Sequence, residues 1–199
     1  MSIIAVSAGH HHWSPGARYK TEFVEHTEAI IWACQIVAHM HGRAKLVPFG
    51  CLKDKTRFIN GLDNISLAME VHFNSAKQYE LDEAGNMVVD YINGAGKPVY
   101  KFRHVGNGSE TLYCPGSEAG LPFANIVQEV LANNFQPSRG IKPGYYQMDP
   151  KRGPDYFLKR TKCPAIIIEP DFVQNYKHIQ EMREQTCMDI AHKLLEVLG

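Results

Sequence analysis

The chain has 199 residues, 44% of them hydrophobic, and its 21 acidic and 21 basic side chains leave no formal net charge. This length and composition indicate one folded domain and exclude a disordered chain. The balanced charge gives no argument for a nucleic-acid or anionic-membrane partner, so we expect neither.

The N-terminal residues and the cysteines bear on where the protein is made. The run MSIIAVSAGH (residues 1–10) is too short for a signal peptide, and no apolar run is long enough to span a bilayer. The five cysteines form no CxxC pair, and an odd number cannot be fully paired within one chain. We interpret them as mostly buried thiols of a reducing compartment and expect the protein to be cytoplasmic as synthesised.

Strand and helix signals alternate along the chain. Short runs rich in apolar or β-branched residues predict strands at residues 2–8, 44–50, 66–76, 110–116 and 164–170. Amphipathic or polar helical patterns predict helices at residues 28–42, 53–62, 121–135 and 176–199. For the first of these helices, Thr21 or Thr27 is the expected N-terminal cap and Gly42 the expected C-terminal cap.

Residues 77–108 interrupt this alternation. Asp, Gly and Asn residues surround two β-rich runs, MVVDYI and PVYKFRHV, and predict a β-hairpin that turns at Asn93-Gly94. The order of all the elements predicts an α/β fold. We expect a three-layer sandwich with a twisted, mostly parallel central sheet flanked by helices, plus this β-hairpin insertion.

Three of the predicted strands end at a side chain that can bind a metal or move a proton. His10 follows the first strand, His72 lies near the end of the third, and Glu169 ends the last. Because the carboxyl ends of parallel strands meet at one edge of a sheet, we expect these residues to lie close together. Catalytic zinc needs three nitrogen or oxygen ligands, an open position and a nearby base. The two histidines, a glutamate from residues 22–28 and Glu169 would supply them.

Five segments also resemble, in the same order, the motifs of one enzyme family. They are GHHHWSPGA (residues 9–17), EVHFNSA (70–76), GSETLYCPGSEAGLPFANIVQEVL (108–131), RGIK (139–142) and PAIIIEPDFVQN (164–175). These segments are similar to motifs of the zinc-dependent N-acetylmuramoyl-L-alanine amidases, in which the fourth motif is a turn. Each motif is weak alone, but together they cover nearly the whole chain. The resemblance implies that residues 1–199 form a single catalytic amidase domain.

The resemblance implies three zinc ligands. The first is the histidine directly after the glycine of the first motif, which is His10, and the third is His72. The second is a glutamate at the start of the following helix. The family's spacing of apolar positions fits best when it is counted from Glu25, with Glu22 as the second choice. Counted from Glu25, the matching positions are Ile30, Ala33 and Ile36.

The resemblance also implies an activity. The enzyme would cleave the amide bond between N-acetylmuramic acid and L-alanine in peptidoglycan, with zinc activating a water molecule and Glu169 moving its proton. Asn74, two residues after His72, would bind the substrate or orient a ligand. The small size suggests a phage lysis enzyme that acts on the cell wall after its release from the cytoplasm.

Two other functions stay open. One is a zinc carboxypeptidase or endopeptidase that cuts within the peptidoglycan stem peptide, although Trp13 stands three residues after His10, where an H-x-x-E pair would have its glutamate. The other is a non-catalytic amidase-fold binding protein. It stays open because His11 and His12 replace two glycines of the family and would narrow access to the metal, and because Pro170 would stiffen the catalytic loop. The sequence does not predict an oligomeric state.

Overall fold

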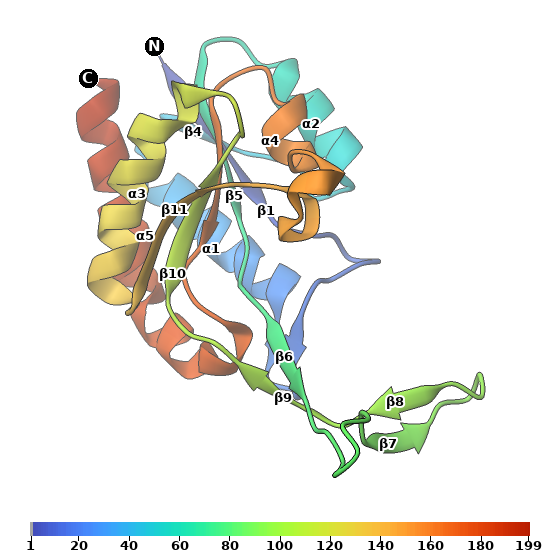
Figure 1. The fold of residues 1–199 in the computed structure, drawn as a ribbon. Coiled ribbons are helices and arrows are strands. Elements are labelled where there is room, and N and C mark those ends of the chain that lie inside the picture. Colours follow the sequence, from blue (N-terminus) through green and yellow to red (C-terminus); the bar gives the residue numbers. More distant parts are fainter. Residues whose placement is uncertain (1) are drawn as a thin grey trace.

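A six-stranded sheet forms the centre of the protein in a computed structural model that describes residues 2–199 (Figure 1). Its strands, in spatial order, are β11 (Ser138–Pro143), β10 (Ser109–Tyr113), β12 (Ala165–Glu169), β5 (Ile65–Val71), β1 (Ile3–Ala8) and β4 (Ala44–Leu46). Neighbouring strands are parallel except for β10 and β12, which run antiparallel. The sheet is therefore mostly parallel, as the alternation of elements predicted.

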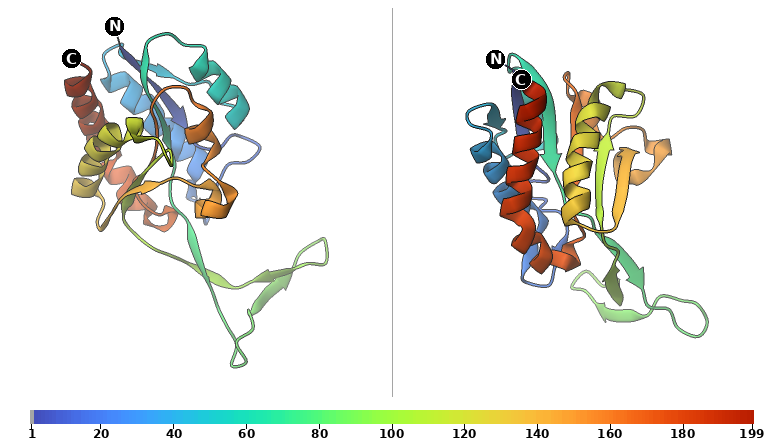
Figure 2. Two further views of the ribbon diagram at one scale, coloured as in Figure 1. Left: turned by 45° about the horizontal axis from the view of Figure 1, so that its top comes forward. Right: turned by 90° about the vertical axis from the view of Figure 1, so that its left-hand side faces the viewer.

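Helices cover both faces of this sheet (Figure 2). One face carries α1 (Glu25–His39), α3 (Leu121–Asn134) and α5 (Tyr176–Leu198), and the other carries α2 (Leu52–Asn60) and α4 (Tyr156–Arg160). Along β5, Leu67, Met69 and Val71 face the first layer, whereas Ala68 faces the second. The period of two along the strand thus divides the core into two layers and confirms the three-layer sandwich.

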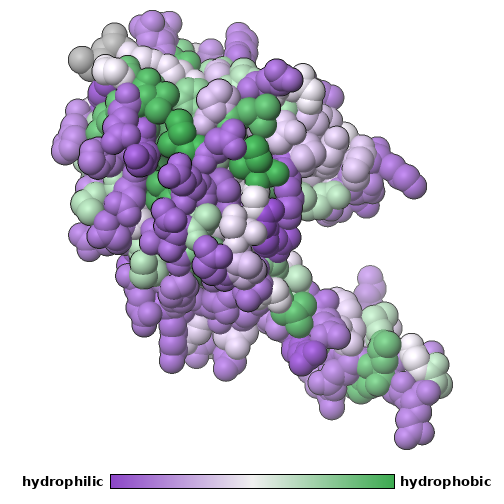
Figure 3. Space-filling model, turned by 60° about the vertical axis from the view of Figure 1, so that its left-hand side comes forward, coloured by the Kyte–Doolittle hydropathy of each residue, from purple (hydrophilic) through white to green (hydrophobic). Residues whose placement is uncertain are grey.

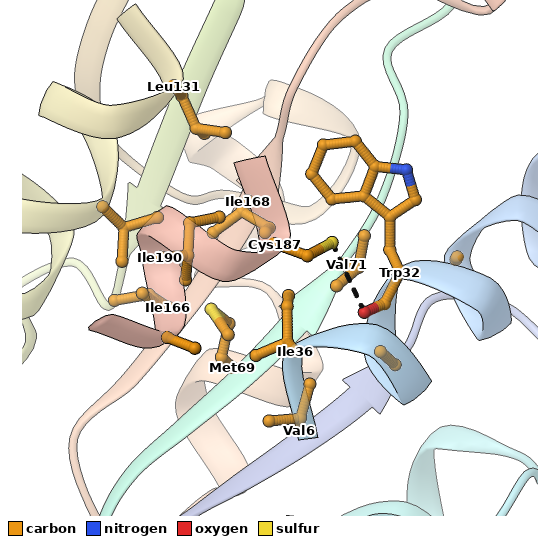
Figure 4. Packing of buried hydrophobic residues seen from close by; sticks show 14 of the residues in the cluster. Val6, Trp32, Ile36, Met69, Val71, Leu131, Ile166, Ile168, Cys187 and Ile190 are labelled. Carbon is orange, nitrogen blue, oxygen red and sulfur yellow. Dashed lines mark hydrogen bonds between the residues drawn. The ribbon is translucent and has the colours of Figure 1, made fainter. Parts of the chain in front are cut away.

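The larger core lies between the sheet and α1, α3 and α5 (Figure 4). Trp32 and Ile36 of α1 meet Met69 and Ile168 of the sheet there, and all four side chains are fully buried. Burial of one such side chain contributes roughly 1.5–3 kcal/mol. The Cys187 thiol of α5 also donates a 3.7 Å hydrogen bond to the Trp32 carbonyl. This packing fixes α1, which begins at Glu25.

Residues 76–105 form an arm that projects from the body of the protein (Figures 1 and 3). In the arm, β6 (Ala76–Tyr79) pairs with β9 (Phe102–Val105), and β7 (Val89–Ile92) pairs with β8 (Pro98–Tyr100) near the tip. The Asn93 side chain accepts hydrogen bonds from the main-chain N–H groups of Ala95 and Lys97 and closes the turn. The arm confirms the predicted hairpin.

Short elements complete the described part of the chain. They are β2 (Arg18–Tyr19), β3 (Phe23–Val24), and the 3-10 helices η1 (Glu118–Gly120), η2 (Tyr146–Met148), η3 (Pro150–Arg152) and η4 (Val173–Asn175). No helix of residues 2–199 combines the length and the apolar character needed to cross a membrane.

Three local predictions were wrong. The RGIK segment is not a turn, because its main chain pairs in parallel with β10 as part of β11. Neither Thr21 nor Thr27 caps α1, since the helix follows Val24 without a side-chain cap and ends at His39, before Gly42. The cysteines are all free, but only Cys187 is buried. The other four lie at exposed or half-buried positions, where their small side chains take no part in the main core.

Candidate active site

The ends of three adjacent strands form the candidate site. His10 follows β1, His72 follows β5, and Glu169 is the last residue of β12. The Gly9 N–H donates a 2.7 Å hydrogen bond to the Val71 carbonyl, which keeps the two histidine-bearing segments together beyond the sheet. The structure thus brings the strand-end residues to one edge, as the sequence predicted.

Glu25 joins the two histidines. Its Oε1 atom lies 3.0 Å from His10 Nε2 and 3.1 Å from His72 Nδ1. One ligand atom from each of the three residues lies within 4.8 Å of the others. A tetrahedral zinc with bonds of 2.0–2.1 Å holds its ligand atoms roughly 3.4 Å apart, and two histidines with one carboxylate are a known catalytic zinc set. The donor types and their spacing therefore fit a zinc ion.

The other two glutamates of this segment lie elsewhere. Glu22 is exposed and accepts a hydrogen bond from the Thr21 N–H. Glu28 is buried, but its carboxylate accepts a 2.7 Å hydrogen bond from Arg183 Nη1. Of the glutamates that the sequence offered, Glu25 is the one that faces both histidines.

Two glycines allow the ligand side chains to come this close. A Cβ atom on Gly16 would lie 2.6 Å from His10 Nε2 and also against the Glu25 carboxylate, and Gly16 has φ +77°, which favours glycine. A Cβ atom on Gly9 would lie 2.6 Å from the His72 ring. Since no side chain fits at either position, both glycines of the GHHHWSPGA segment are required by the site.

Main-chain N–H groups hold the Glu25 carboxylate, and a third histidine, His26, holds the loop that follows β1. The Glu25 carboxylate accepts hydrogen bonds from the N–H groups of Ala17 and Phe73, at 2.7 Å and 3.1 Å. His26 lies buried in the first turn of α1, and its Nδ1 is 2.7 Å from the Gly9 carbonyl oxygen. These hydrogen bonds fix the orientation of the carboxylate and the position of the loop.

The charges within this cluster stabilise each other. Burial alone would raise the pKa of Glu25, but hydrogen bonds from His10 and His72 outweigh it and hold the pKa well below its ordinary value. Burial would lower the pKa of His72, but hydrogen bonds to Glu25 and Glu70 raise it well above the ordinary value. Because histidine must be neutral to bind zinc, metal binding here releases a proton.

Glu169 has the opposite environment. Burial is the main reason that its pKa rises from 4.5 to about 8. The nearby carboxylates of Glu25 and Glu110 raise it further, while the positive charges of His72 and Arg139 oppose them. A carboxyl group that titrates near neutral pH is suited to proton transfer.

A second charged cluster lies beside Glu169, on the neighbouring strand. Glu110 of β10 pairs in register with Glu169. Its carboxylate accepts a 2.9 Å hydrogen bond from the Asn74 amide and forms ion pairs with Arg139 and Lys142. The predicted substrate role of Asn74 therefore stays a prediction, since its amide is engaged by Glu110. Glu110, Arg139 and Lys142 lie within segments that resemble family motifs, but no pattern in the sequence indicated that their side chains meet.

The loop of residues 10–14 is a tight turn. His11 and Ser14 exchange main-chain hydrogen bonds of 3.2 Å and 2.9 Å, and His12 and Trp13 lie exposed at its tip. The His12 ring contacts the Trp13 ring edge to face, with centroids 5.0 Å apart. His12 therefore lies apart from His10, Glu25 and His72, the three residues that could hold a metal ion.

The chain is similar to a known family over almost its full length. Residues 4–198 match the model of a family described as N-acetylmuramoyl-L-alanine amidase. No curated protein sequence matches the chain. The family match agrees with the five motif resemblances and extends across the arm as well.

Three solved structures illustrate the likeness of fold. The catalytic domain of CwlV, an amidase from Bacillus (Paenibacillus) polymyxa var. colistinus, is 19% identical over 100% of this chain and 98% of its own, with a TM-score of 0.70. AmiC2 of Nostoc punctiforme is 19% identical over 98% and 97% of the two chains, with a TM-score of 0.69. The catalytic domain of the CD27L endolysin targeting Clostridia Difficile is 19% identical over 98% of both chains, with a TM-score of 0.67.

Proposed function

Because the chain belongs to the N-acetylmuramoyl-L-alanine amidase family, we propose that it is a zinc enzyme that hydrolyses the amide bond between N-acetylmuramic acid and L-alanine in peptidoglycan. The observation that carries the zinc assignment is the convergence of His10, Glu25 and His72 at the sheet edge that also bears Glu169. These three residues would hold the ion.

The chain's own residues supply the proton transfers. When bound, zinc supplies Lewis acidity, which lowers the pKa of a water molecule and polarises the scissile carbonyl. Glu169, ionised, takes the proton from the attacking water and forms a carboxylic acid. It then gives this proton to the amine nitrogen of L-alanine as the carbon–nitrogen bond breaks. A pKa raised by burial makes Glu169 able to act in both directions near neutral pH.

The first test combines zinc content with product analysis. The wild type is expected to hold about one zinc per chain and to release intact stem peptides that begin with L-alanine. Glu169→Ala is expected to keep zinc and to lose turnover. Glu22→Ala is the matched control, because it removes an exposed glutamate three residues before Glu25, and it should change neither quantity.

Each alternative function gives a different result. Fragmented stem peptides would identify a peptidase that cuts within the stem. Zinc without release of any peptide, from walls of several types, would identify a binding protein. A wild type without zinc, or a zinc loss in Glu22→Ala, would contradict the ligand assignment.

A lysis role is the finer part of the proposal. It is supported by the resemblance to the CD27L endolysin catalytic domain, which this chain covers over 98% of its length. Bacteria that express the protein should keep intact walls until their membrane is permeabilised, and should then lyse rapidly. Permeabilised cells that stay intact, although the purified protein cuts isolated walls, would contradict this role.

A further inference from the structure

A buried ion pair lies behind the histidine ligands. The Nζ atom of Lys55 in α2 lies 2.9 Å from the Oε1 atom of Glu70 in β5, and both side chains are 1% exposed. Removing two charges from water costs several kcal/mol per ion, and two apolar side chains often fill such a space equally well. The pair is therefore weak evidence for stability, and its contacts indicate another role.

Glu70 holds the ring of His72. Glu70 lies in β5 and His72 follows the strand directly, two positions further on, so their side chains lie on the same side of the sheet. Glu70 Oε2 lies 3.1 Å from His72 Nε2, while His72 Nδ1 faces Glu25 at 3.1 Å. A carboxylate on one ring nitrogen keeps the proton there and leaves the other nitrogen free to bind a metal. Glu70 thus sets both the ring orientation and the tautomer that a zinc ligand needs.

Lys55 extends this support to the other histidine. Its ammonium has three donors, one for Glu70 and two for main-chain carbonyls. One carbonyl belongs to Ala8 and the other, at 2.8 Å, belongs to His10. His10 has φ +61°, a left-handed conformation that is strained for a residue other than glycine. The ammonium therefore fixes the main chain where the first ligand leaves β1.

We propose that Lys55 and Glu70 form one positioning unit for both histidine ligands. Glu70 fixes the ring of His72, and Lys55 couples that carboxylate to the main chain of His10. The inference rests on the zinc site of the proposed function. Both residues are positioning residues, because they support the ligands from within the protein and do not reach the substrate.

Glu70→Gln is the most direct variant. The glutamine side chain keeps the size of glutamate but has one oxygen and one NH₂ group in place of two oxygens. If its oxygen faces Lys55, its NH₂ group donates to His72 Nε2 and forces the proton onto Nδ1. If its oxygen faces His72, its NH₂ group points at the Lys55 ammonium, and these two hydrogen-bond donors repel each other. We expect the zinc dissociation constant to rise about 10–100-fold, as for other partners of metal-binding histidines.

A double variant separates positioning from stability. Lys55→Met with Glu70→Leu fills the space with apolar groups and leaves no buried charge unpaired, so the folded state should be about as stable as the wild type. Its zinc affinity should stay lowered at least as much as in Glu70→Gln. Glu28→Gln is the control, because it changes the buried carboxylate of another ion pair, with the partly exposed Arg183, that does not contact the two histidines.

The measurement is zinc competition against a chromophoric chelator on each full-length variant, with thermal unfolding of the zinc-free forms. Weaker zinc binding in both Glu70 variants, with normal binding in Glu28→Gln, is the expected result. If the wild type binds zinc and releases stem peptides but the double variant binds zinc as tightly, the inference is wrong and the proposed function stands. If the wild type binds no zinc, both are wrong.

Discussion

Glu70 and Glu169 are two carboxylates on adjacent strands, on the same face and near the same edge of the sheet. The pKa of Glu70 falls to about 2, because hydrogen bonding to His72 and the charge of Lys55 outweigh its burial. The pKa of Glu169 rises to about 8, because burial is its main influence and the Glu25 and Glu110 carboxylates add to it. Both carboxylates are buried, so the charged and hydrogen-bonding groups around each one decide whether its pKa falls or rises.

The difference assigns the two residues different tasks. Glu70 is ionised near neutral pH, so it can hold a histidine but does not exchange protons there. Glu169 can gain and lose a proton near neutral pH, as the proposed proton transfers require.

The largest effect is expected for the catalytic member of the pair. Glu169→Gln keeps the size and polarity of the side chain but cannot accept a proton, so kcat should fall about 10²–10⁴-fold. Zinc content should not change, because Glu169 is not one of the three residues that face each other as ligands. Peptide release and metal analysis on the same sample check both points. Residual activity above a tenth of the wild type would assign the base to another residue.

Lys55→Met should move the pKa of Glu70 towards the raised pKa of Glu169. The variant leaves Glu70 buried without its ammonium partner, so its pKa should rise, and breaking such a pair costs about 3–5 kcal/mol. Urea unfolding of the zinc-free protein measures the loss. Lys53→Met, which changes an exposed lysine of the same helix, should unfold like the wild type. Equal stabilities for the two variants would show that the ion pair has no net effect on folding.

Glu169 should make stability depend on pH. Its folded pKa of about 8 lies above the ordinary 4.5, so the folded state binds the proton more tightly. This contribution to stability is complete below pH 4.5 and is lost as the pH rises to 8. In zinc-free protein, Glu169→Gln should therefore be more stable than the wild type at pH 8.5, by an amount on the order of 2–4 kcal/mol, and nearly equal at pH 4.5. Urea unfolding at the two pH values checks the sign.

The smallest effect is expected from Arg139. Its positive charge lowers the pKa of Glu169, so Arg139→Gln should move the acid limb of the kcat/KM profile to higher pH. Since Arg139 is partly exposed, the loss below neutral pH should be only a few-fold, or about 1 kcal/mol. Arg152→Gln, at an exposed pair with Asp149, is the control. A profile that moves to lower pH would mean that Arg139 acts on Glu169 only through Glu110.

The fold and the strand-end residues could be predicted because local patterns determine them. The apolar run that ends at Glu169 and the alternation that ends at His72 each predict a strand and the side chain at its end. Glu25 could not be chosen from spacing alone among three nearby glutamates. The family resemblance selected it, and the main-chain donors of Ala17 and Phe73 give the physical reason.

The supports behind the site could not be predicted, because they depend on tertiary contacts. Lys55 stands in a helix of mostly polar residues and has no local sign of burial, yet it is 2% exposed beneath the sheet edge. The RGIK segment has the glycine and charges typical of a turn, but pairing with β10 makes it a strand. In both cases a partner distant in sequence overrides the local preference.

The position of β12 makes closure of the sheet depend on the last strand of the chain. β12 is the last strand in the chain but lies in the middle of the sheet, where it joins β5 to β10. Until Glu169 has been synthesised, the strands before it form two separate groups, each with an unpaired edge. A nascent chain on the ribosome thus carries both histidines and Glu25 long before it has a base or a closed sheet. A fragment that ends before residue 169 would lack both the strand that joins the two groups and the base that we propose.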